Sequence, residues 1–595
     1  MKLLPPIISA LVLTCLPAAP AKPLLDIIDS DADLVLAVHD VTGLRESWAE
    51  HPLAERLNAP ELSQFLGAFL STVSEEESPS NRMTAVLREE FNLTWQELAE
   101  LFPGPVGGGL FNLPEMLLGA EERPDLAILA EFSGSAERLD ELMQIQFERN
   151  ARAQKEVNPL IEHEMVEENF MGETLYFDEV FDGERTYTED GYAFVEGIFI
   201  LATPRERLRS VVESIKAGTE VPLRQTRGYR RLRDERPAGD LTFYVNLEAI
   251  VPALNAALKD PAKTGGLAML GVNGASLELA LALPALLGFG FDLELTEDGL
   301  ASHTGLMFRE KAGLLRLLTY GDIGLPRASY VPEKILSSSV TSFDLSAMLA
   351  ELEAILTSAS PSVGPLFEIQ LQNTKSQTGV DLRSAVFENF GPELVTLSVL
   401  PQGGPRSEVV PQQEQLFVIE IKDAASLSGA LEALKDQVPG LRAQIEVREF
   451  QGQTIHRFKS AQEPGMPGSP AQEVSYAITR SHLLVNVGRI ALLQEVLAAM
   501  QAGSEGFWQL PEVEDRFRRI GRPNTVTRSY FDLSQAVAPA LQSLATFMSM
   551  AGSNQGQNPE VPEGLDFPYY LISDMNETEE AFFSRSLLVP KEAGE

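Results

Sequence analysis

Four short groups of residues carry side chains or backbone suited to chemistry: 39–40, 104–109, 162–164 and 224–236. The glycine run Gly104-Pro-Val-Gly-Gly-Gly109 is of the kind that cradles phosphate in some loops. It lacks the Gly-Lys-Ser/Thr ending of a P-loop and the Gly-x-Gly-x-x-Gly spacing of a dinucleotide site. The matching place in the second half reads Glu393-Leu-Val-Thr-Leu397, a plain strand pattern. The run therefore predicts glycines that relieve backbone strain or mark a bulge, not a phosphate site.

Glu162-His163-Glu164 would suit a metal ion if its three side chains converged. On a strand the two glutamates face one way and the histidine the other, so they do not converge. With Glu167 and Glu168 they predict a solvated acidic segment. The six histidines are scattered, at 39, 51, 163, 303, 456 and 482, and no His-Glu-x-x-His occurs. We expect no metal ion and no other cofactor.

His39 and Asp40 would form half of a catalytic triad if a serine nucleophile were present. Neither Gly-x-Ser-x-Gly nor Ser-x-x-Lys occurs. His39 continues an apolar strand, and Asp40 stands where the next helix needs an N-cap, so packing and capping are the favoured roles. We assign no catalytic residue. An enzyme would have to gather its site from residues distant in the sequence.

The densest positive group in the chain consists of Arg224, Arg227, Arg230, Arg231, Arg233 and Arg236. One interpretation is a surface that holds an anionic ligand or an acidic partner. The favoured one is a solvated helix on which Asp234 and Glu235 form ion pairs with the arginines.

One stretch of the chain occurs twice, as Tyr192–Gly218 and Tyr476–Gly503. Apolar residues at helical spacing recur 285 residues later: Leu208, Val211, Val212 and Ile215 as Leu493, Val496, Leu497 and Met500. Each helix follows a short apolar run, 198–202 or 483–487, and ends in Ala-Gly. We therefore predict a strand, a turn and a helix, duplicated with the domain that contains them.

Further matches keep the same order in both halves. Strands near 33–39 and 340–345 each run into an aspartate, Asp40 or Asp344, that is placed to cap a helix. Phe170-x-Gly172 recurs as Phe450-x-Gly452, a turn that leads into a strand. An antiparallel hairpin is expected to close each half, with turns at Asp298-Gly299 and at Asn576-Glu577-Thr578.

These patterns predict an α+β fold of two tandem homologous halves, each a mainly antiparallel sheet with helices packed on one face. Proline and glycine interrupt the periodicity between 321 and 334, so we place the halves at 22–325 and 326–595.

The first 21 residues resemble an export signal: Lys2, an apolar stretch from Ile7 to Leu16, and a small-x-small site with cleavage after Ala21. A lipoprotein signal ending at Cys15 fits less well, because Thr14 precedes that cysteine. The expected location is therefore periplasmic or secreted. No later run is long and apolar enough to span a membrane. The net charge of −39 argues against binding to nucleic acid.

The chain resembles a family of uncharacterised exported bacterial proteins, common in planctomycete-type bacteria. The resemblance is carried by Leu34–His39, by Phe170-x-Gly172, by the Tyr192–Gly218 stretch and by Leu241-Thr-Phe-Tyr-Val245. It covers most of 31–250 and, more weakly, the second half. It implies export and an α+β fold, and it carries over no catalytic residue.

The favoured hypothesis is a non-enzymatic binding or scaffolding protein of the cell envelope, with an envelope protein as a possible partner. The alternatives are a carrier of an apolar ligand such as lipid, with a groove lined by runs such as Leu279–Phe291, and a hydrolase without a local motif.

Overall fold

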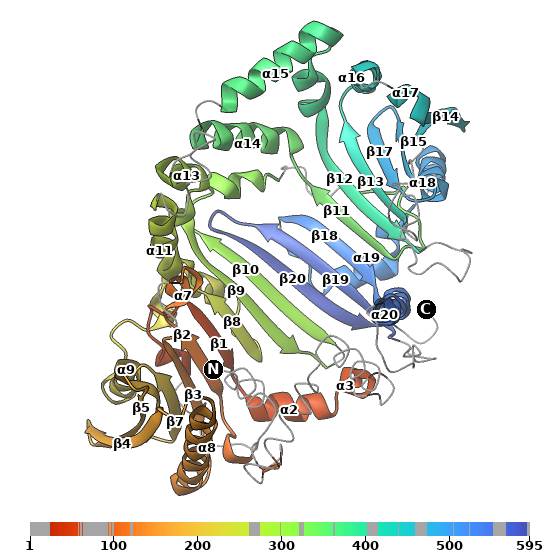
Figure 1. The fold of residues 1–595 in the computed structure, drawn as a ribbon. Helices are drawn as coiled ribbons and strands as arrows, with labels where there is room; N and C mark the ends of the chain where they lie inside the picture. The colour runs from red at the N-terminus through yellow and green to blue at the C-terminus, as the bar shows by residue number, and fades with distance from the viewer. Residues whose placement is uncertain are drawn as a thin grey trace. The chain divides into compact units, whose positions relative to one another are not determined.

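The structure, a computed structural model, describes residues 24–591 with gaps (Figure 1). The longer gaps are 63–87, 261–273, 401–413, 459–472 and 551–566, and the shorter ones are 58, 60–61, 89–92, 95–96, 98–99, 120–122, 298, 321–326, 361–362, 438–439, 504 and 523. Only the backbone is described at 279, 363 and 543–550. The predicted export signal, with Cys15, lies outside the described residues.

Contacts between Cα atoms divide the chain into two compact units. Unit 1 comprises Met1–Ala257 and Leu286–Arg309, and unit 2 comprises Leu258–Ala285 and Glu310–Glu595. The boundary predicted at 325 and 326 falls on residues that the structure does not describe, and it stays a prediction.

Unit 1 contains an antiparallel sheet in the order β10-β9-β8-β1-β2-β3-β7-β6-β5-β4. Its strands are β1 (Leu34–Val38), β2 (Val106–Leu110), β3 (Leu126–Glu131), β4 (Glu162–Phe170), β5 (Glu173–Phe181), β6 (Thr186–Val195), β7 (Ile198–Thr203), β8 (Leu241–Val245), β9 (Leu286–Leu295) and β10 (Leu300–Phe308).

Unit 2 contains an antiparallel sheet in the order β20-β19-β18-β11-β12-β13-β17-β16-β15-β14. Its strands are β11 (Ser337–Ser342), β12 (Phe390–Val399), β13 (Glu414–Ile421), β14 (Ile445–Phe450), β15 (Gln453–Phe458), β16 (Val474–Ile478), β17 (His482–Val487), β18 (Thr525–Asp532), β19 (Tyr569–Glu577) and β20 (Ala581–Pro590). Each strand of unit 1 thus has a counterpart, ten numbers higher, at the same place in the order.

The helices of unit 1 are η1 (Leu24–Asp26), α2 (Val41–Ala49), α3 (Pro52–Leu57), α7 (Leu113–Leu117), α8 (Ala136–Val157), α9 (Arg205–Ala217), η2 (Leu223–Gln225), α10 (Arg227–Glu235) and α11 (Leu247–Lys259). Those of unit 2 are α13 (Gly274–Leu281), η3 (Leu283–Ala285), η4 (Gly313–Leu317), α14 (Leu345–Ala359), α15 (Val363–Thr378), the π-helical η5 (Arg383–Phe387), α16 (Ala424–Gln437), α17 (Leu441–Gln444), α18 (Ala491–Ala502), η6 (Phe507–Gln509), α19 (Pro511–Arg518) and α20 (Leu533–Met550). With these helices on antiparallel sheets, the chain is an α+β protein, as predicted. None of the described helices combines the length and the apolar character that crossing a bilayer requires.

The stretch that occurs twice folds as predicted in both units. In unit 1, β7 leads into α9, whose apolar face, Leu208 to Ile215, is buried. In unit 2, β17 leads into α18, where Leu493, Val496 and Leu497 are buried in the same way. Each helix ends at a glycine with positive φ, 91° at Gly218 and 63° at Gly503, the backbone region that glycine occupies without strain.

The predicted helix caps are confirmed, and the turns predicted at Phe170-x-Gly172 and Phe450-x-Gly452 each join two paired strands. Asp298, of the turn predicted at Asp298-Gly299, lies outside the described residues. Asp40 accepts a hydrogen bond from the amide of Gly43 at 2.8 Å, and Asp344 accepts one from that of Ala347 at 2.9 Å. The turn predicted at Asn576-Glu577-Thr578 is wrong by two residues. Asn576 and Glu577 belong to β19, and the turn closes where the amide of Thr578 donates to the carbonyl of Ala581. A strand continues as long as its partner supplies hydrogen bonds, which turn-forming residue types do not reveal.

Candidate functional site

Unit 1 holds a pocket of about 470 Å³ where β1 begins, β2 and β8 end, and α11 starts. The strands bring these places together because β1 lies between β2 and β8 in the sheet. The pocket is lined by Ser30, Asp31, Asp33, Phe111, Pro114, Glu115, Val221, Thr226, Asn246, Glu248, Ala249, Pro252 and Ala253. Four of these residues are carboxylates and none is lysine or arginine, so the lining favours positive charge. We call it pocket 1.

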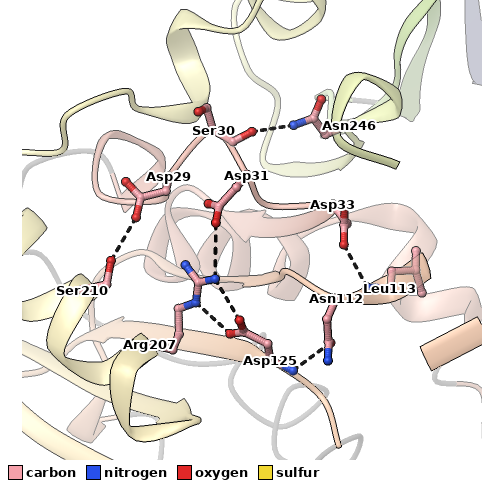
Figure 2. Close-up of polar contacts among 10 residues, drawn as sticks. All are labelled: Asp29, Ser30, Asp31, Asp33, Asn112, Leu113, Asp125, Arg207, Ser210 and Asn246. Carbon is pink, nitrogen blue, oxygen red and sulfur yellow. Dashed lines mark hydrogen bonds and ion pairs between the residues drawn. The ribbon is translucent and has the colours of Figure 1, made fainter. Parts of the chain in front are cut away.

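Asp33 is the most buried acid of pocket 1, with 3% of its surface exposed. Its Oδ2 accepts a hydrogen bond from the amide of Leu113 at 2.8 Å, which starts α7 (Figure 2). The pKa of Asp33 is raised to about 6, mainly by burial and to a smaller extent by the nearby carboxylates of Glu115 and Asp31, whereas the hydrogen bond from Leu113 lowers it. Asp33 therefore titrates close to neutral pH.

Asn246, directly after β8, forms another part of the wall and is 1% exposed. Its Nδ2 donates to the carbonyl of Ser30 at 2.8 Å (Figure 2). Its Oδ1 is buried and has no hydrogen-bond partner among the described residues. A buried amide oxygen without a donor costs free energy, about 1–3 kcal/mol in comparable proteins. This oxygen therefore offers an acceptor to a ligand that brings a donor.

Arg207 of α9 fixes the loop that carries Asp31. Its Nε and Nη2 donate to the two oxygens of Asp125 at 2.7 and 2.9 Å, and Nη2 lies 3.4 Å from Oδ2 of Asp31 (Figure 2). The guanidinium carbon also lies 3.4 Å from the centre of the Phe111 ring. Asp31 thus has a cationic partner inside the protein. Glu248 has one too, since Arg309 donates to its Oε1 at 2.7 Å.

Unit 2 holds a second pocket, pocket 2, also of about 470 Å³. It is lined by Glu333, Lys334, Ile335, Leu336, Val399, Leu400, Phe507, Leu510, Glu512, Val513, Arg516, Tyr530, Asp532, Gln535 and Tyr570. It lies where β11 begins, β12 and β18 end, and α20 starts. That is the same place in the strand order as pocket 1 occupies in unit 1.

Backbone hydrogen bonds make the correspondence residue by residue. The amide of Asn246 donates to the carbonyl of Asp33, and the amide of Asp532 donates to that of Leu336, both at 2.8 Å. Leu336 therefore stands in unit 2 where Asp33 stands in unit 1, and Asp532 stands where Asn246 does. The two pockets share a position but differ in the groups that line it.

Both side-chain oxygens of Asp532 accept hydrogen bonds, whereas Oδ1 of Asn246 accepts none from the described residues. Its Oδ1 accepts from the amide and hydroxyl of Ser534, and its Oδ2 from Gln535 at 2.6 Å and from the ammonium of Lys591 at 3.0 Å. Pocket 2 also contains the cation of Arg516, whose guanidinium lies 4.3 Å from the ring centre of Tyr570. Its charge is therefore largely balanced within the protein.

Val106 to Gly109 of the glycine run lie in β2, in the middle of the sheet. Gly107 to Gly109 pair in regular register with both β1 and β3, so the expected bulge is absent. A Cβ on Gly108 would stand 2.6 Å from the carbonyl oxygen of Ala127. The glycines therefore let β2 lie close to β3, a requirement of packing.

Asp40 takes the capping role that the sequence predicts, whereas His39 follows the end of β1 and makes a polar contact. His39 Nε2 lies 2.9 Å from Oγ1 of Thr242 on the neighbouring strand, and Asp40 caps α2. For Glu162-His163-Glu164 the expected alternation holds, but a fully solvated segment is wrong for His163. Its ring is buried, and Nδ1 lies 2.8 Å from Oδ1 of Asp178, which the facing strand β5 supplies. No group of three or more His, Cys, Asp or Glu in the described residues is arranged to hold a metal ion.

Of the arginine group, Arg227, Arg230, Arg231 and Arg233 lie in α10, Arg224 lies in η2 and Arg236 caps the C-terminus of α10. Three of them form ion pairs with acids outside the helix. Arg233 reaches Asp292 of β9 at 2.8 Å, Arg236 reaches Glu294, and Arg224 reaches Asp26 at 2.7 Å. The partners come from elements distant in the sequence, because α10 packs against β9, which carries Asp292 and Glu294, and η2 packs against η1, which carries Asp26. Neighbouring acids on the same helix do not reveal such pairs.

Asp33, Glu115 and Asn246 were not singled out by sequence reasoning. A polar residue just before or just after a buried strand is the one signal in the sequence, and many surface loops share it. The run Leu279–Phe291, expected to line a carrier groove, divides between α13, η3 and β9, and none of its residues lines pocket 1 or pocket 2.

Comparisons with known proteins give one family match. Residues 391–561, within unit 2, match the family described as "Protein of unknown function (DUF3352)". No curated protein matches the chain. Solved structures titled crystal forms I, III and IV of TP0453 are 10% identical, and form I covers 49% of this chain and 80% of its own with a TM-score of 0.21. A TM-score this low does not establish a shared fold. The chain thus resembles a family of proteins of unknown function, and the matched segment lies in its second half rather than in 31–250.

Proposed function

We propose that this chain is an exported, non-enzymatic binding protein of the cell envelope, built from two homologous units that each carry a ligand pocket. The observation that supports it best is the position of the two pockets. Both lie beside the first strand of their sheet, between the ends of its two neighbours. Duplication of an ancestral unit explains the same strand order in both sheets. Divergence of the linings explains why one pocket is acidic and the other is nearly balanced.

Binding is tested by a thermal-shift screen of small molecules on the full chain, because a ligand that binds only the folded protein raises its unfolding temperature. Ala253→Trp fills pocket 1 from α11, and Leu400→Trp fills pocket 2 from the end of β12. Ala256→Trp, on an exposed position of α11, is the matched control. We expect at least one ligand whose shift disappears in a filled variant and survives in the control. A screen without such a ligand contradicts the proposal.

Export is tested separately. Mass spectrometry of the protein purified from its native envelope fraction should give an N-terminus at Lys22, as cleavage after Ala21 requires. A lipidated Cys15 at the N-terminus contradicts this cleavage site, and an intact Met1 in the cytoplasmic fraction contradicts export.

A further inference from the structure

Two of the carboxylates of pocket 1 have no cationic partner among the residues that the structure describes. Of its four acids, Asp31 is paired with Arg207 and Glu248 with Arg309. For Asp33 and Glu115 no ion pair is found among the described residues, and Asp33 is almost fully buried. Buried charge is costly unless it is paired. The pocket therefore lacks positive charge at one defined place, around Asp33.

A second observation points to the same kind of ligand. Asn246, whose backbone amide donates to the carbonyl of Asp33, also lines the pocket, and its amide oxygen is buried without a donor in the described part of the chain. A carboxylate and an amide oxygen both accept hydrogen bonds and donate none once the acid is ionised. The ligand must therefore supply donors, and a charged donor forms the stronger bond with the carboxylate.

Unit 2 shows what kind of donor fits this place. Lys591 follows β20 as Arg309 follows β10, and its ammonium bonds both Asp532 and the hydroxyl of Ser534. Asp532 and Ser534 stand where unit 1 has Asn246 and Glu248. In unit 1, Arg309 is directed to Glu248 and leaves Asn246 without a donor. Unit 2 thus carries an internal ammonium group beside Asp532, the counterpart of Asn246, whose amide oxygen has no donor among the described residues.

A metal ion fits this arrangement less well than an organic cation. The acids of pocket 1 are distributed around its wall, and no three of the described carboxylates or imidazoles converge on one point. Hard cations require several oxygens at about 2.0–2.6 Å from a single centre. The aliphatic wall of Pro114, Val221, Ala249 and Pro252 suits methylene groups instead.

We infer that pocket 1 binds a small aliphatic amine, whose ammonium group takes the place beside Asp33 and Asn246 that Lys591 fills beside Asp532 in unit 2. This rests on the proposed function, because it names the ligand class of the same pocket. A diamine uses the pocket most fully, with Glu115 as the partner of its second ammonium group.

The test is calorimetric titration of the full chain with putrescine at an ionic strength of about 0.15 M, where loose attraction to an acidic surface is largely screened. Asp33→Asn keeps the shape and the acceptor for Leu113 but removes the charge. We expect it to weaken binding by about tenfold or more, the effect of losing one charge-assisted contact. Glu46→Gln removes the same charge at an exposed position of α2 and should leave affinity unchanged.

A transplant of the unit 2 residues tests the comparison directly. Asn246→Asp, Glu248→Ser and Arg309→Lys together give unit 1 its own internal ammonium group. This variant should remain folded and lose putrescine binding, whereas Asn246→Asp alone should bind at least as tightly as the wild type. A transplant variant that binds like the wild type contradicts the inference.

The pH dependence gives a further check. Ionised Asp33 is the form that binds an ammonium group, and the charges around it are Asp31, Glu115, Asp125, Glu248 and the Arg207 guanidinium. Since the pKa of Asp33 is about 6, affinity should fall about tenfold between pH 7.5 and about pH 5 in the wild type, and stay flat in Asp33→Asn.

Several outcomes overturn the inference without touching the proposed function. These are Asp33-dependent binding of Mg²⁺ or Ca²⁺ alone, binding of a lysine-rich peptide without binding of putrescine, and a ligand from the screen that requires pocket 1 but carries no positive charge. Equal loss in Asp33→Asn and Glu46→Gln also overturns it, since binding would then reflect overall acidity. If no compound of any class depends on pocket 1 or pocket 2, the proposed function fails as well.

Discussion

At the scale of single residues, Asp33 carries a linkage between pH and stability. Its pKa is raised to about 6 in the folded protein and returns to an ordinary value near 3.8 on unfolding. Between these values the folded state holds the proton and the unfolded state does not. Stability from this group is therefore fully present below about pH 4 and is lost as pH rises through 6.

Asp33→Asn cannot ionise, so it should avoid the loss of folding free energy above about pH 6 and be more stable than the wild type at neutral pH. A shift of this size corresponds to about 3 kcal/mol at most, at 1.36 kcal/mol for each pH unit, and we expect roughly 1–3 kcal/mol. Urea unfolding of both proteins at about pH 4 and about pH 7.5 checks this. The two should agree at the lower pH, and the variant should be more stable at the higher one. A difference that is independent of pH would show that the carboxylate charge is not its cause.

Each unit buries an aspartate at the same place in its sheet, and the two units pair it with arginines from different elements. Asp292 on β9 and Asp574 on β19 occupy the same register position and are both buried. Arg233 of α10 pairs with the first, whereas Arg528 of β18 pairs with the second through two contacts of 3.0 and 3.1 Å. The two aspartates occupy corresponding positions, but the two arginines do not. A sequence comparison of the halves therefore finds the acid but not its partner.

At the scale of elements, β2 needs glycine because the neighbouring strands leave no room for a Cβ atom at position 108. The Cβ of an alanine at 108 would meet a backbone oxygen of β3, and a backbone atom in mid-sheet cannot move aside. We expect Gly108→Ala to destabilise the protein by about 1–3 kcal/mol, as overpacking does elsewhere. Gly429→Ala, in α16 with open space around it, should instead stabilise by up to about 1 kcal/mol. Denaturant unfolding measures both, and an unchanged midpoint for Gly108→Ala would contradict the close packing of β2 and β3.

At the scale of the whole chain, the segment from Leu258 to Ala285 groups with unit 2 although it is flanked by unit 1 in the sequence. Its helix α13 packs against α14, which lies in unit 2. The predicted first half, 22–325, would therefore carry α13 without this partner.

We expect a fragment of residues 22–325 to bind a hydrophobic dye and to aggregate, because the apolar surface of α13 stays uncovered. The same fragment with 258–285 replaced by a flexible linker should be monomeric and free of dye binding. Size-exclusion chromatography with dye fluorescence distinguishes them. A monomeric 22–325 fragment that binds no dye would show that α13 does not need unit 2.

The sequence alone determined the α+β class, the repeated strand-turn-helix stretch and the aspartate caps. Each depends on residues a few positions apart, whose periodicity and capping chemistry act within one element. Tertiary structure decided the partners of His163 and of the arginines on α10, and it placed Asp33 beside Asn246. These residues are 213 positions apart and meet only because β1 pairs with β8. Strand order is fixed by packing of the complete sheet, so a pocket at the strand ends appears only once the sheet has formed.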